Sequence, residues 1–192
     1  MTGRGYTVFD TSIGRCGIAW GPLGILSVQL PADREIETRR RLLRQFPEAR
    51  ELEPPAEAGL AIDGIAATLR GQPADFSDVT LDIREVSPFA RRVYDLTRTI
   101  LRGETMTYNE VADRLKPPGA PHAVAHALSQ NPFPIIVPCH RVLGAGGYAD
   151  RMSVNGGSIS KRRLLSIDGA GGKSSQTLFD VLLPVARPPL QR

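Results

Sequence analysis

The most informative stretch of this sequence is Asn131-Pro-Phe-Pro-Ile-Ile-Val-Pro-Cys139-His140-Arg141-Val142. The run of β-branched residues before Pro138 predicts a buried strand, and the proline cannot continue the hydrogen-bonded ladder of that strand. We therefore expect Cys139 where the strand ends, with its thiol facing the edge of a pocket. A neighbouring imidazole either accepts the proton of a thiol or stabilises the thiolate, and His140 and Arg141 supply both possibilities. A structural thiol beside a surface histidine would give the same dipeptide.

The composition narrows the class of protein. The chain has 192 residues, with 41% hydrophobic and 23% charged residues, which excludes a wholly disordered chain and allows one large or two small domains. Its two cysteines, Cys16 and Cys139, are too few for a disulfide framework or a cysteine-rich zinc site. No long apolar run and no secretory leader pattern is visible, so we expect a soluble cytoplasmic protein with no membrane partner.

The formal net charge of +4 is distributed unevenly. Residues 1–86 carry 10 basic and 13 acidic side chains, residues 87–168 carry 11 and 6, and residues 169–192 carry 3 and 1. The excess in the second part favours a polyanion such as DNA, through release of counterions. An ordinary arginine-rich surface would have the same balance.

The first part of the chain has the pattern of a small α/β domain over residues 1–86. Strands are expected over Phe9–Trp20 and Gly24–Leu30, joined by a turn at Gly21-Pro22, and again over Val79–Ile83. Helices are expected over Asp33–Phe46 and Leu60–Leu69. No catalytic constellation is evident there.

From Ser87 onward the pattern is helical. Ser87-Pro88 predicts the start of an amphipathic helix, and Thr107 with Glu110 predicts a capping box on a second helix, which ends at Lys116-Pro117-Pro118-Gly119. A third helix is expected over Pro121–Gln130, so that the pair has the outline of a helix-turn-helix. A last helix is expected over Ser160–Ser166. We place this domain at residues 87–170 and a C-terminal tail at 171–192.

Several motifs at fixed spacing carry a family resemblance. Pro138-Cys139-His140-Arg141-Val142, preceded by Asn131-Pro132 and followed by Gly156-Gly157 and Lys161-Arg-Arg-Leu-Leu, closely resembles the O6-alkylguanine-DNA alkyltransferases. The resemblance covers roughly residues 6–169 and is strongest after residue 87. It implies a ribonuclease-H-like α/β domain followed by a winged helix-turn-helix domain. It also implies DNA repair by irreversible transfer of an alkyl group from O6-alkylguanine, with O4-alkylthymine as a further substrate, to a cysteine that reacts once.

The resemblance assigns roles residue by residue. Cys139 is the alkyl acceptor, His140 is the base that takes its proton through water, and Asp168 stands where the family usually has the glutamate that orients the histidine. Tyr108 matches the tyrosine that donates to guanine N3, and Asn131 matches the asparagine that holds the turn before the active-site strand. The partner implied is double-stranded DNA containing alkylated guanine, bound by a monomer. No cofactor is implied, and no metal, although His122 and His126 share a helix face.

The predicted DNA-facing residues contain two departures from the family. They comprise His122, Ala123, Val124, Ala127, Arg141, Val154, Asn155 and Gly156. His122-Ala123-Val124 stands where the family has Arg-Ala-Val, so the arginine that fills the place of the flipped base is replaced by histidine. Val154 stands where the family usually has tyrosine. These changes predict weakened extraction of a base from duplex DNA.

Two other functions stay open at this stage. One is a nonenzymatic protein that binds alkylated DNA, which the retained Cys139 argues against. The other is an enzyme of the alkyltransferase fold whose thiol acts on a substrate other than DNA.

Overall fold

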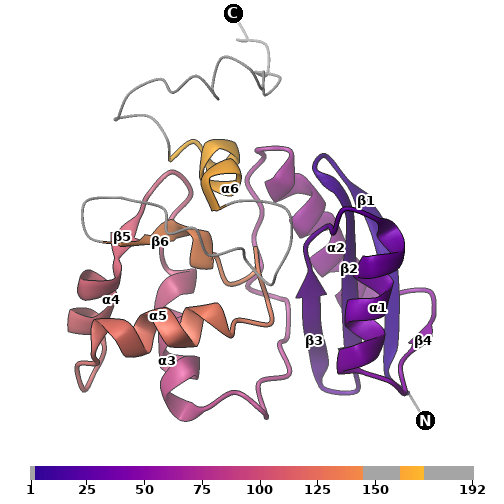
Figure 1. Ribbon diagram of the computed structural model, residues 1–192, viewed down its shortest axis with the longest axis horizontal. Coiled ribbons are helices and arrows are strands. Elements are labelled where there is room, and N and C mark those ends of the chain that lie inside the picture. Colours follow the sequence, from indigo (N-terminus) through magenta and orange to yellow (C-terminus); the bar gives the residue numbers. More distant parts are fainter. Residues whose placement is uncertain (1–2, 145–160, 171–192) are drawn as a thin grey trace, which may run out of the picture.

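The computed structural model describes residues 3–144 and 161–170, and the predicted tail at 171–192 lies outside this range. The first part of the chain forms a four-stranded sheet of β1 (Gly5–Thr11), β2 (Gly14–Gly21), β3 (Gly24–Gln29) and β4 (Arg50–Glu51). The strand order is β3-β2-β1-β4, with only the β1–β4 pair parallel. Helix α1 (Glu35–Gln45) covers one face of the sheet and α2 (Ala56–Leu69) the other (Figure 1).

The alternation of side chains along β2 explains the two helical layers. Cys16, Ile18 and Trp20 point to the face covered by α2, whereas Ala19 belongs to the smaller cluster under α1 with Leu42. Gly17 lies directly beneath α1, and a Cβ there would lie 2.6 Å from Leu42 Cδ1. The glycine therefore allows α1 to pack closely on β2.

The strand boundaries differ from the sequence prediction in two places. The expected strand over Phe9–Trp20 is two strands, β1 and β2, joined by a turn at Ser12-Ile13 and closed by Gly14, whose φ is +125°. Val79–Ile83 forms no strand but a single bridge between Leu81 and Ile25. The segment runs parallel to the start of β3 at this bridge. The two backbones are so close that a Cβ on Gly24 would lie 2.4 Å from the Thr80 carbonyl oxygen.

The second part of the chain is mainly helical. It contains α3 (Pro88–Arg98), α4 (Tyr108–Arg114), α5 (Pro121–Ser129) and α6 (Lys161–Asp168). A parallel pair of short strands, β5 (Met106–Thr107) and β6 (Val142–Leu143), and the 3₁₀ turn η1 (Cys139–Arg141) complete it. The structure is thus mixed α/β. Among the described helices, none is long and apolar enough to cross a membrane.

The predicted helix starts at Ser87 and Thr107 are confirmed. Ser87 Oγ accepts a hydrogen bond from the Ala90 amide at 3.2 Å. Thr107 Oγ1 accepts from the Glu110 amide at 3.2 Å, and the Glu110 carboxylate accepts from the Thr107 amide at 2.6 Å. Both ends of the capping box are therefore formed. The cap also fixes where α4 begins, at Tyr108.

The two parts of the chain share one continuous cluster of buried side chains, which includes Ile18 and Ile65 from the first part and Val93 and Val124 from the second. The Val28 amide on β3 donates to the Pro132 carbonyl at 2.8 Å. The packing therefore joins the sheet to the segment that precedes Cys139. The division at residues 86 and 87 stays a prediction.

The capping box gives a stability prediction. Thr107→Ala removes the side-chain oxygen that receives the Glu110 amide, and we expect it to lower the free energy of unfolding by about 1 kcal/mol. Chemical denaturation measures the change. Thr107→Ser keeps the oxygen and is the control; an equal loss in both variants would contradict the role of the cap.

Candidate active site

Asn131 organises the segment that leads to Cys139. Its side chain is buried, with Nδ2 donating to the Val137 carbonyl at 3.0 Å and Oδ1 accepting from the Phe133 amide at 2.9 Å. The Val137 amide also donates back to the Phe133 carbonyl at 2.8 Å. The predicted strand before Pro138 is therefore wrong. Proline has no amide hydrogen, so Pro132 and Pro134 remove two ladder donors, and the segment instead closes on itself as a turn.

Cys139 begins η1 directly after this turn. It is a free cysteine and only 6% exposed, so it is buried where the sequence analysis expected a pocket edge. Burial raises the pKa of the thiol, while a hydrogen bond from Asn131 and the positive charge of Lys161 lower it. The surroundings thus oppose the thiolate by desolvation and favour it by two specific contacts.

His140 and Asp168 are in direct contact inside the protein. His140 Nε2 lies 2.9 Å from Asp168 Oδ2, and the side chains are 2% and 1% exposed. Burial lowers the pKa of His140, against the opposing effect of Asp168, so the imidazole is neutral. Burial raises the pKa of Asp168, but hydrogen bonds from His140 and Arg141 outweigh this and bring it to about 2. The aspartate therefore does reach the histidine despite its short side chain.

The charges fix the tautomer of the imidazole. A neutral ring facing an ionised carboxylate carries its proton on Nε2 and donates it to Asp168. His140 Nδ1 is then an acceptor, and within residues 3–144 and 161–170 this buried atom has no hydrogen-bond partner. It is the atom of the site that is set up to receive a proton.

Arg141 is bound within the protein. Its Nε and Nη2 donate to the two carboxylate oxygens of Asp168 at 2.5 and 3.2 Å, and Nη1 donates to the Ile100 carbonyl at 2.8 Å. The side chain is 13% exposed. These bonds turn the guanidinium inward. The expectation that Arg141 contacts DNA stays a prediction.

Lys161 and Tyr108 form a second polar pair beside the thiol. Lys161 is only 5% exposed, and its Nζ donates to Tyr108 Oη at 3.1 Å and lies 5.2 Å from the centre of the tyrosine ring. The phenol oxygen and the ring hold the ammonium at a defined place. The positive charge of Lys161 lowers the pKa of Cys139.

Comparisons with known proteins agree with this arrangement. Residues 88–170 match the family described as 6-O-methylguanine DNA methyltransferase, DNA binding domain. The methylated-DNA--protein-cysteine methyltransferase of Methanothermobacter thermautotrophicus is 36% identical over 157 residues, which are 80% of this chain and 78% of that relative. The Mycobacterium bovis protein of the same name is 38% identical over 164 residues, 83% of this chain and 94% of that relative.

This chain belongs to the methylated-DNA--protein-cysteine methyltransferase family. Solved structures of proteins with related names also have a similar fold. The O6-methylguanine methyltransferase of Mycobacterium tuberculosis is similar with a TM-score of 0.66 and 34% identity, covering 92% of this chain and 99% of that one. A structure described as the Mycobacterium tuberculosis protein in complex with DNA has a TM-score of 0.62 and 31% identity, covering 86% and 92%.

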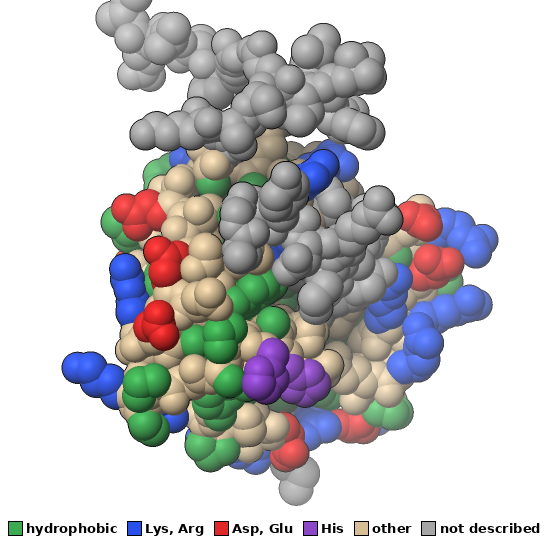
Figure 2. All heavy atoms as spheres, turned by 60° about the vertical axis from the view of Figure 1, so that its left-hand side comes forward, with side chains coloured by type: hydrophobic (Ala, Val, Ile, Leu, Met, Phe, Trp, Pro, Cys, Tyr) green, Lys and Arg blue, Asp and Glu red, His purple; other side chains and the backbone are tan. Residues whose placement is uncertain are grey.

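Helix α5 of this methyltransferase-family chain divides the predicted DNA-facing residues into two groups. His122 is exposed and Ala123 half-buried, whereas Val124 and Ala127 are buried and pack inward. The Ala127 carbonyl also accepts a hydrogen bond from Tyr94 Oη at 3.0 Å. The helical repeat places residues 124 and 127 on the core side, and the expectation that they contact DNA stays a prediction. Figure 2 shows the exposed histidines as a purple patch.

Three predicted site residues lie outside the described residues: Val154, Asn155 and Gly156. Within the described ranges, no group of three or more His, Cys, Asp or Glu side chains could hold a metal ion. The expectations of no metal and no cofactor stay predictions.

Lys161 is the site residue for which sequence analysis offered no role. The signal was present in the helical spacing, because Lys161 shares one face of α6 with the buried Leu164, Leu165 and Asp168. A lysine on the apolar face of a short helix is a buried charge that needs a partner. The sequence alone did not indicate that the partner is Tyr108.

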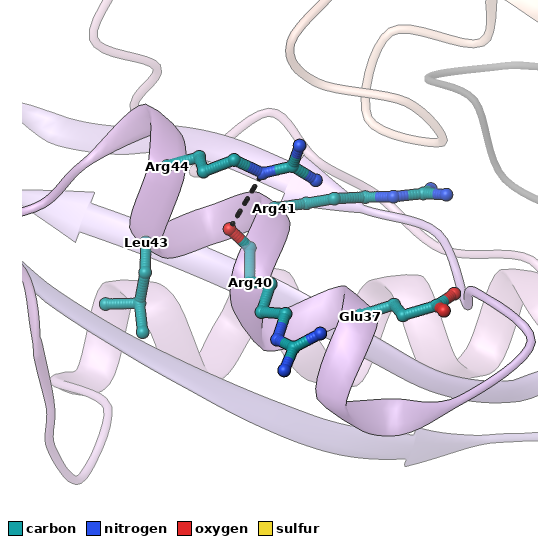
Figure 3. A pocket seen from close by; sticks show the side chains of 5 residues that line it. All are labelled: Glu37, Arg40, Arg41, Leu43 and Arg44. Atoms are coloured by element: carbon teal, nitrogen blue, oxygen red, sulfur yellow. Dashed lines mark hydrogen bonds between the residues drawn. The ribbon is translucent and has the colours of Figure 1, made fainter.

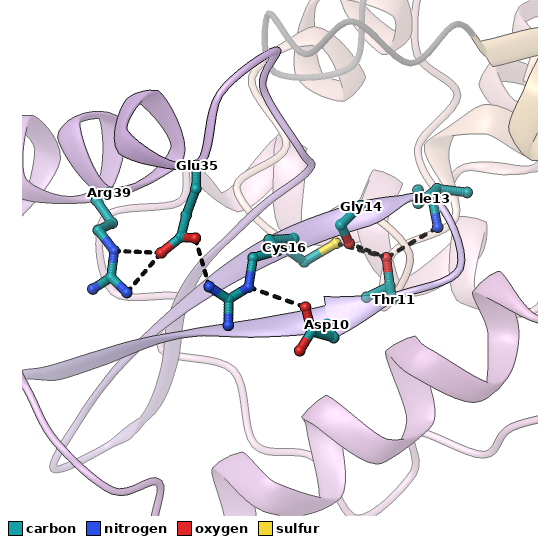
Figure 4. A network of polar contacts seen from close by, with 8 residues as sticks. Asp10, Thr11, Ile13, Gly14, Cys16, Glu35 and Arg39 are labelled. Atoms are coloured by element: carbon teal, nitrogen blue, oxygen red, sulfur yellow. Dashed lines mark hydrogen bonds and ion pairs between the residues drawn. The ribbon is translucent and has the colours of Figure 1, made fainter.

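Cys16 is a packing residue of the core. It is fully buried, and burial raises the pKa of its thiol to about 12. Its Sγ lies 3.8 Å from Thr11 Oγ1, next to a surface network in which Arg15 binds Asp10 and Glu35 (Figure 4). A thiol in these surroundings stays protonated and unreactive at neutral pH.

The lowered pKa of Asp168 predicts the acid sensitivity of the fold. Its pKa falls from 3.8 to about 2 on folding, so its contribution to stability is fully present above about pH 4 and is lost as the pH falls towards 2. We expect a loss of about 2 kcal/mol over this window from this one group. Chemical denaturation at a series of pH values measures it. Asp168→Asn should flatten the dependence, and an unchanged slope in the variant would contradict it.

Proposed function

We propose that this chain repairs DNA by transferring the alkyl group of O6-alkylguanine to Cys139, once per molecule. The new bond joins Sγ to the alkyl carbon, the bond from that carbon to guanine O6 breaks, and the repaired guanine leaves with a proton. The observation that carries the proposal is the buried contact between His140 and Asp168, next to Cys139, in a chain of this family.

His140 serves as the base in this proposal. Its Nδ1 is the acceptor, and the proton of the Cys139 thiol reaches it through water, as the family resemblance implies. Asp168 accepts from Nε2 and stabilises the imidazolium that forms. A neutral imidazole is the form that can accept a proton, which agrees with the lowered pKa of His140.

Arg141 is proposed as a positioning residue. It binds both oxygens of Asp168 and so orients the carboxylate towards His140. Its positive charge keeps Asp168 ionised and disfavours a second positive charge on His140. Asn131 has a related task, since its side chain holds the turn that presents Cys139.

Lys161 is proposed to act on the attacking sulfur and Tyr108 on the leaving guanine. The ammonium stabilises the thiolate, as the lowering of the Cys139 pKa by its charge supports. By resemblance, Tyr108 donates to guanine N3 and stabilises the leaving base. In the hydrogen bond from Lys161 Nζ the phenol oxygen is the acceptor, which is compatible with a donor role for the phenol hydrogen.

We also propose the finer description of the fold and the partner. The sheet with α1 and α2 is the ribonuclease-H-like domain, and α4 and α5 are the helix-turn-helix of a winged domain, with α5 as recognition helix. The partner is double-stranded DNA with an alkylated guanine, bound by a monomer in the cytoplasm. The printed description of a Mycobacterium tuberculosis relative in complex with DNA supports DNA as the partner.

Alkyl transfer to a named cysteine tests the central proposal. After incubation with a duplex containing O6-methylguanine, mass spectrometry should find one methyl group on the peptide of Cys139 and none on that of Cys16. Cys139→Ser should abolish the transfer, and Cys16→Ser should retain it. No methylation of Cys139 under excess DNA would reject the repair proposal.

Replacing His122 by the arginine that the family has at this position gives a second test. His122→Arg should raise the rate of transfer from duplex DNA, because a longer and permanently charged side chain supports the gap left by the flipped base better. The rate with free O6-benzylguanine should stay unchanged. His126→Arg adds the same charge on the same exposed face and is the control. An equal increase in the transfer rate from duplex DNA in both variants would contradict a specific role for an arginine at position 122.

A further inference from the structure

Helix α1 carries a cationic surface that the proposed chemistry does not use. Arg40, Arg41 and Arg44 line a hollow of about 610 Å³ together with Leu43 and Glu37 (Figure 3). Arg40 and Arg44 are exposed, and Arg44 Nε donates to the Arg40 carbonyl at 3.4 Å. Within residues 3–144 and 161–170 neither of the two forms an ion pair. We call Arg40 and Arg44, the two exposed arginines of this set, the α1 arginine face.

Other arginines on or beside α1 differ from this set because carboxylates hold them. Arg39 forms ion pairs with Glu35 and Glu51, and Arg34 forms one with Glu37 at 3.4 Å. Glu37 is the carboxylate among the lining residues of the hollow, and Arg34 already offsets its charge. The α1 arginine face therefore presents a net positive charge to solvent.

Within residues 87–144 and 161–170, the exposed cations lie outside the helix that is proposed to face DNA. Helix α5 contains no lysine or arginine. Several arginines of the second part donate to carbonyls outside their own helix, whereas Arg44 binds a carbonyl within α1. These bonds join Arg91 to Val86, Arg92 to Pro117, Arg98 to Phe76 and Arg102 to Ile167. Arg114 and Lys116, at the end of α4, remain exposed. Phosphates supply most of the affinity of DNA-binding proteins, so a duplex bound at α5 needs cations from elsewhere.

The placement of α1 and α5 suggests where these additional cations come from. In Figure 1, α1 lies in front of the sheet and α5 in front of α3, so that both helices are on the near side of the molecule. We propose that the α1 arginine face is a second phosphate-binding surface, which contacts the backbone of the duplex beyond the segment held by α5. This inference rests on the proposed function and extends it to the length of DNA that the protein grips.

Charge reversal on α1 tests this surface. Arg40→Glu should weaken binding to a long duplex several-fold at low salt. It should also reduce the slope of log affinity against log salt by about one for each phosphate that the protein no longer neutralises. Binding to a short duplex that covers only the α5 footprint should change little. Arg44→Glu should behave in the same way, which guards against a local folding defect in one variant.

Arg70→Glu is the matched control. Arg70 is exposed at the end of α2, which lies on the opposite face of the sheet, and its reversal changes the net charge by the same amount (Figure 1). Equal weakening by Arg40→Glu and Arg70→Glu would overturn the α1 surface and indicate general electrostatics.

Alkyl transfer from free O6-benzylguanine separates this test from that of the proposed function. It should be the same in all variants, because that donor has no phosphate backbone. Normal transfer with identical binding of Arg40→Glu and wild type overturns only the α1 surface. Normal duplex binding that depends on Arg40, without alkylation of Cys139, overturns only the proposed reaction.

Discussion

The buried carboxylate of Asp168 is the group on which the arrangement of the site depends. A buried ion is costly unless its partners replace the water it has given up, and Asp168 receives hydrogen bonds from both His140 and Arg141. Arg141 also binds the Ile100 carbonyl, just after α3. The end of α6, the turn η1 and the end of α3 are therefore fixed relative to one another. Because α6 begins at Lys161, fixing its last residue also helps to place its first beside Tyr108.

The charges of these buried groups complement a thiolate. Around the neutral His140, the site described above has two cations, Arg141 and Lys161, and one anion, Asp168. The positive charge of Lys161 favours ionisation of Cys139. Burial nevertheless raises the pKa of the thiol. The two effects together describe a nucleophile that is protected in the resting protein and stabilised once it gives up its proton.

Sequence predicts this molecule well where contacts are local or family spacing carries the information. The caps at Ser87 and Thr107 depend on neighbours within a few residues, and His140 and Asp168, which the family resemblance relates, lie in contact. The β-branched residues before Cys139 favour a strand, but two prolines and the Asn131 side chain make a turn instead. The partners of Arg141 and Lys161 could not be predicted, because these groups are distant in sequence and meet only through packing.

The residues proposed for chemistry and those proposed for DNA recognition lie at different depths in this molecule. Cys139, His140 and Asp168 are buried, whereas His122 and His126 lie on the surface of α5, so exchange of the family arginine leaves the chemical groups in place. The proposed phosphate contacts on α1 belong to the other part of the chain. One of the contacts between the two parts is the hydrogen bond from the Val28 amide to the Pro132 carbonyl, in the turn that Asn131 holds. A duplex bound at both α1 and α5 would therefore contact both of the parts that this hydrogen bond joins, and the bond lies in the turn that leads to Cys139.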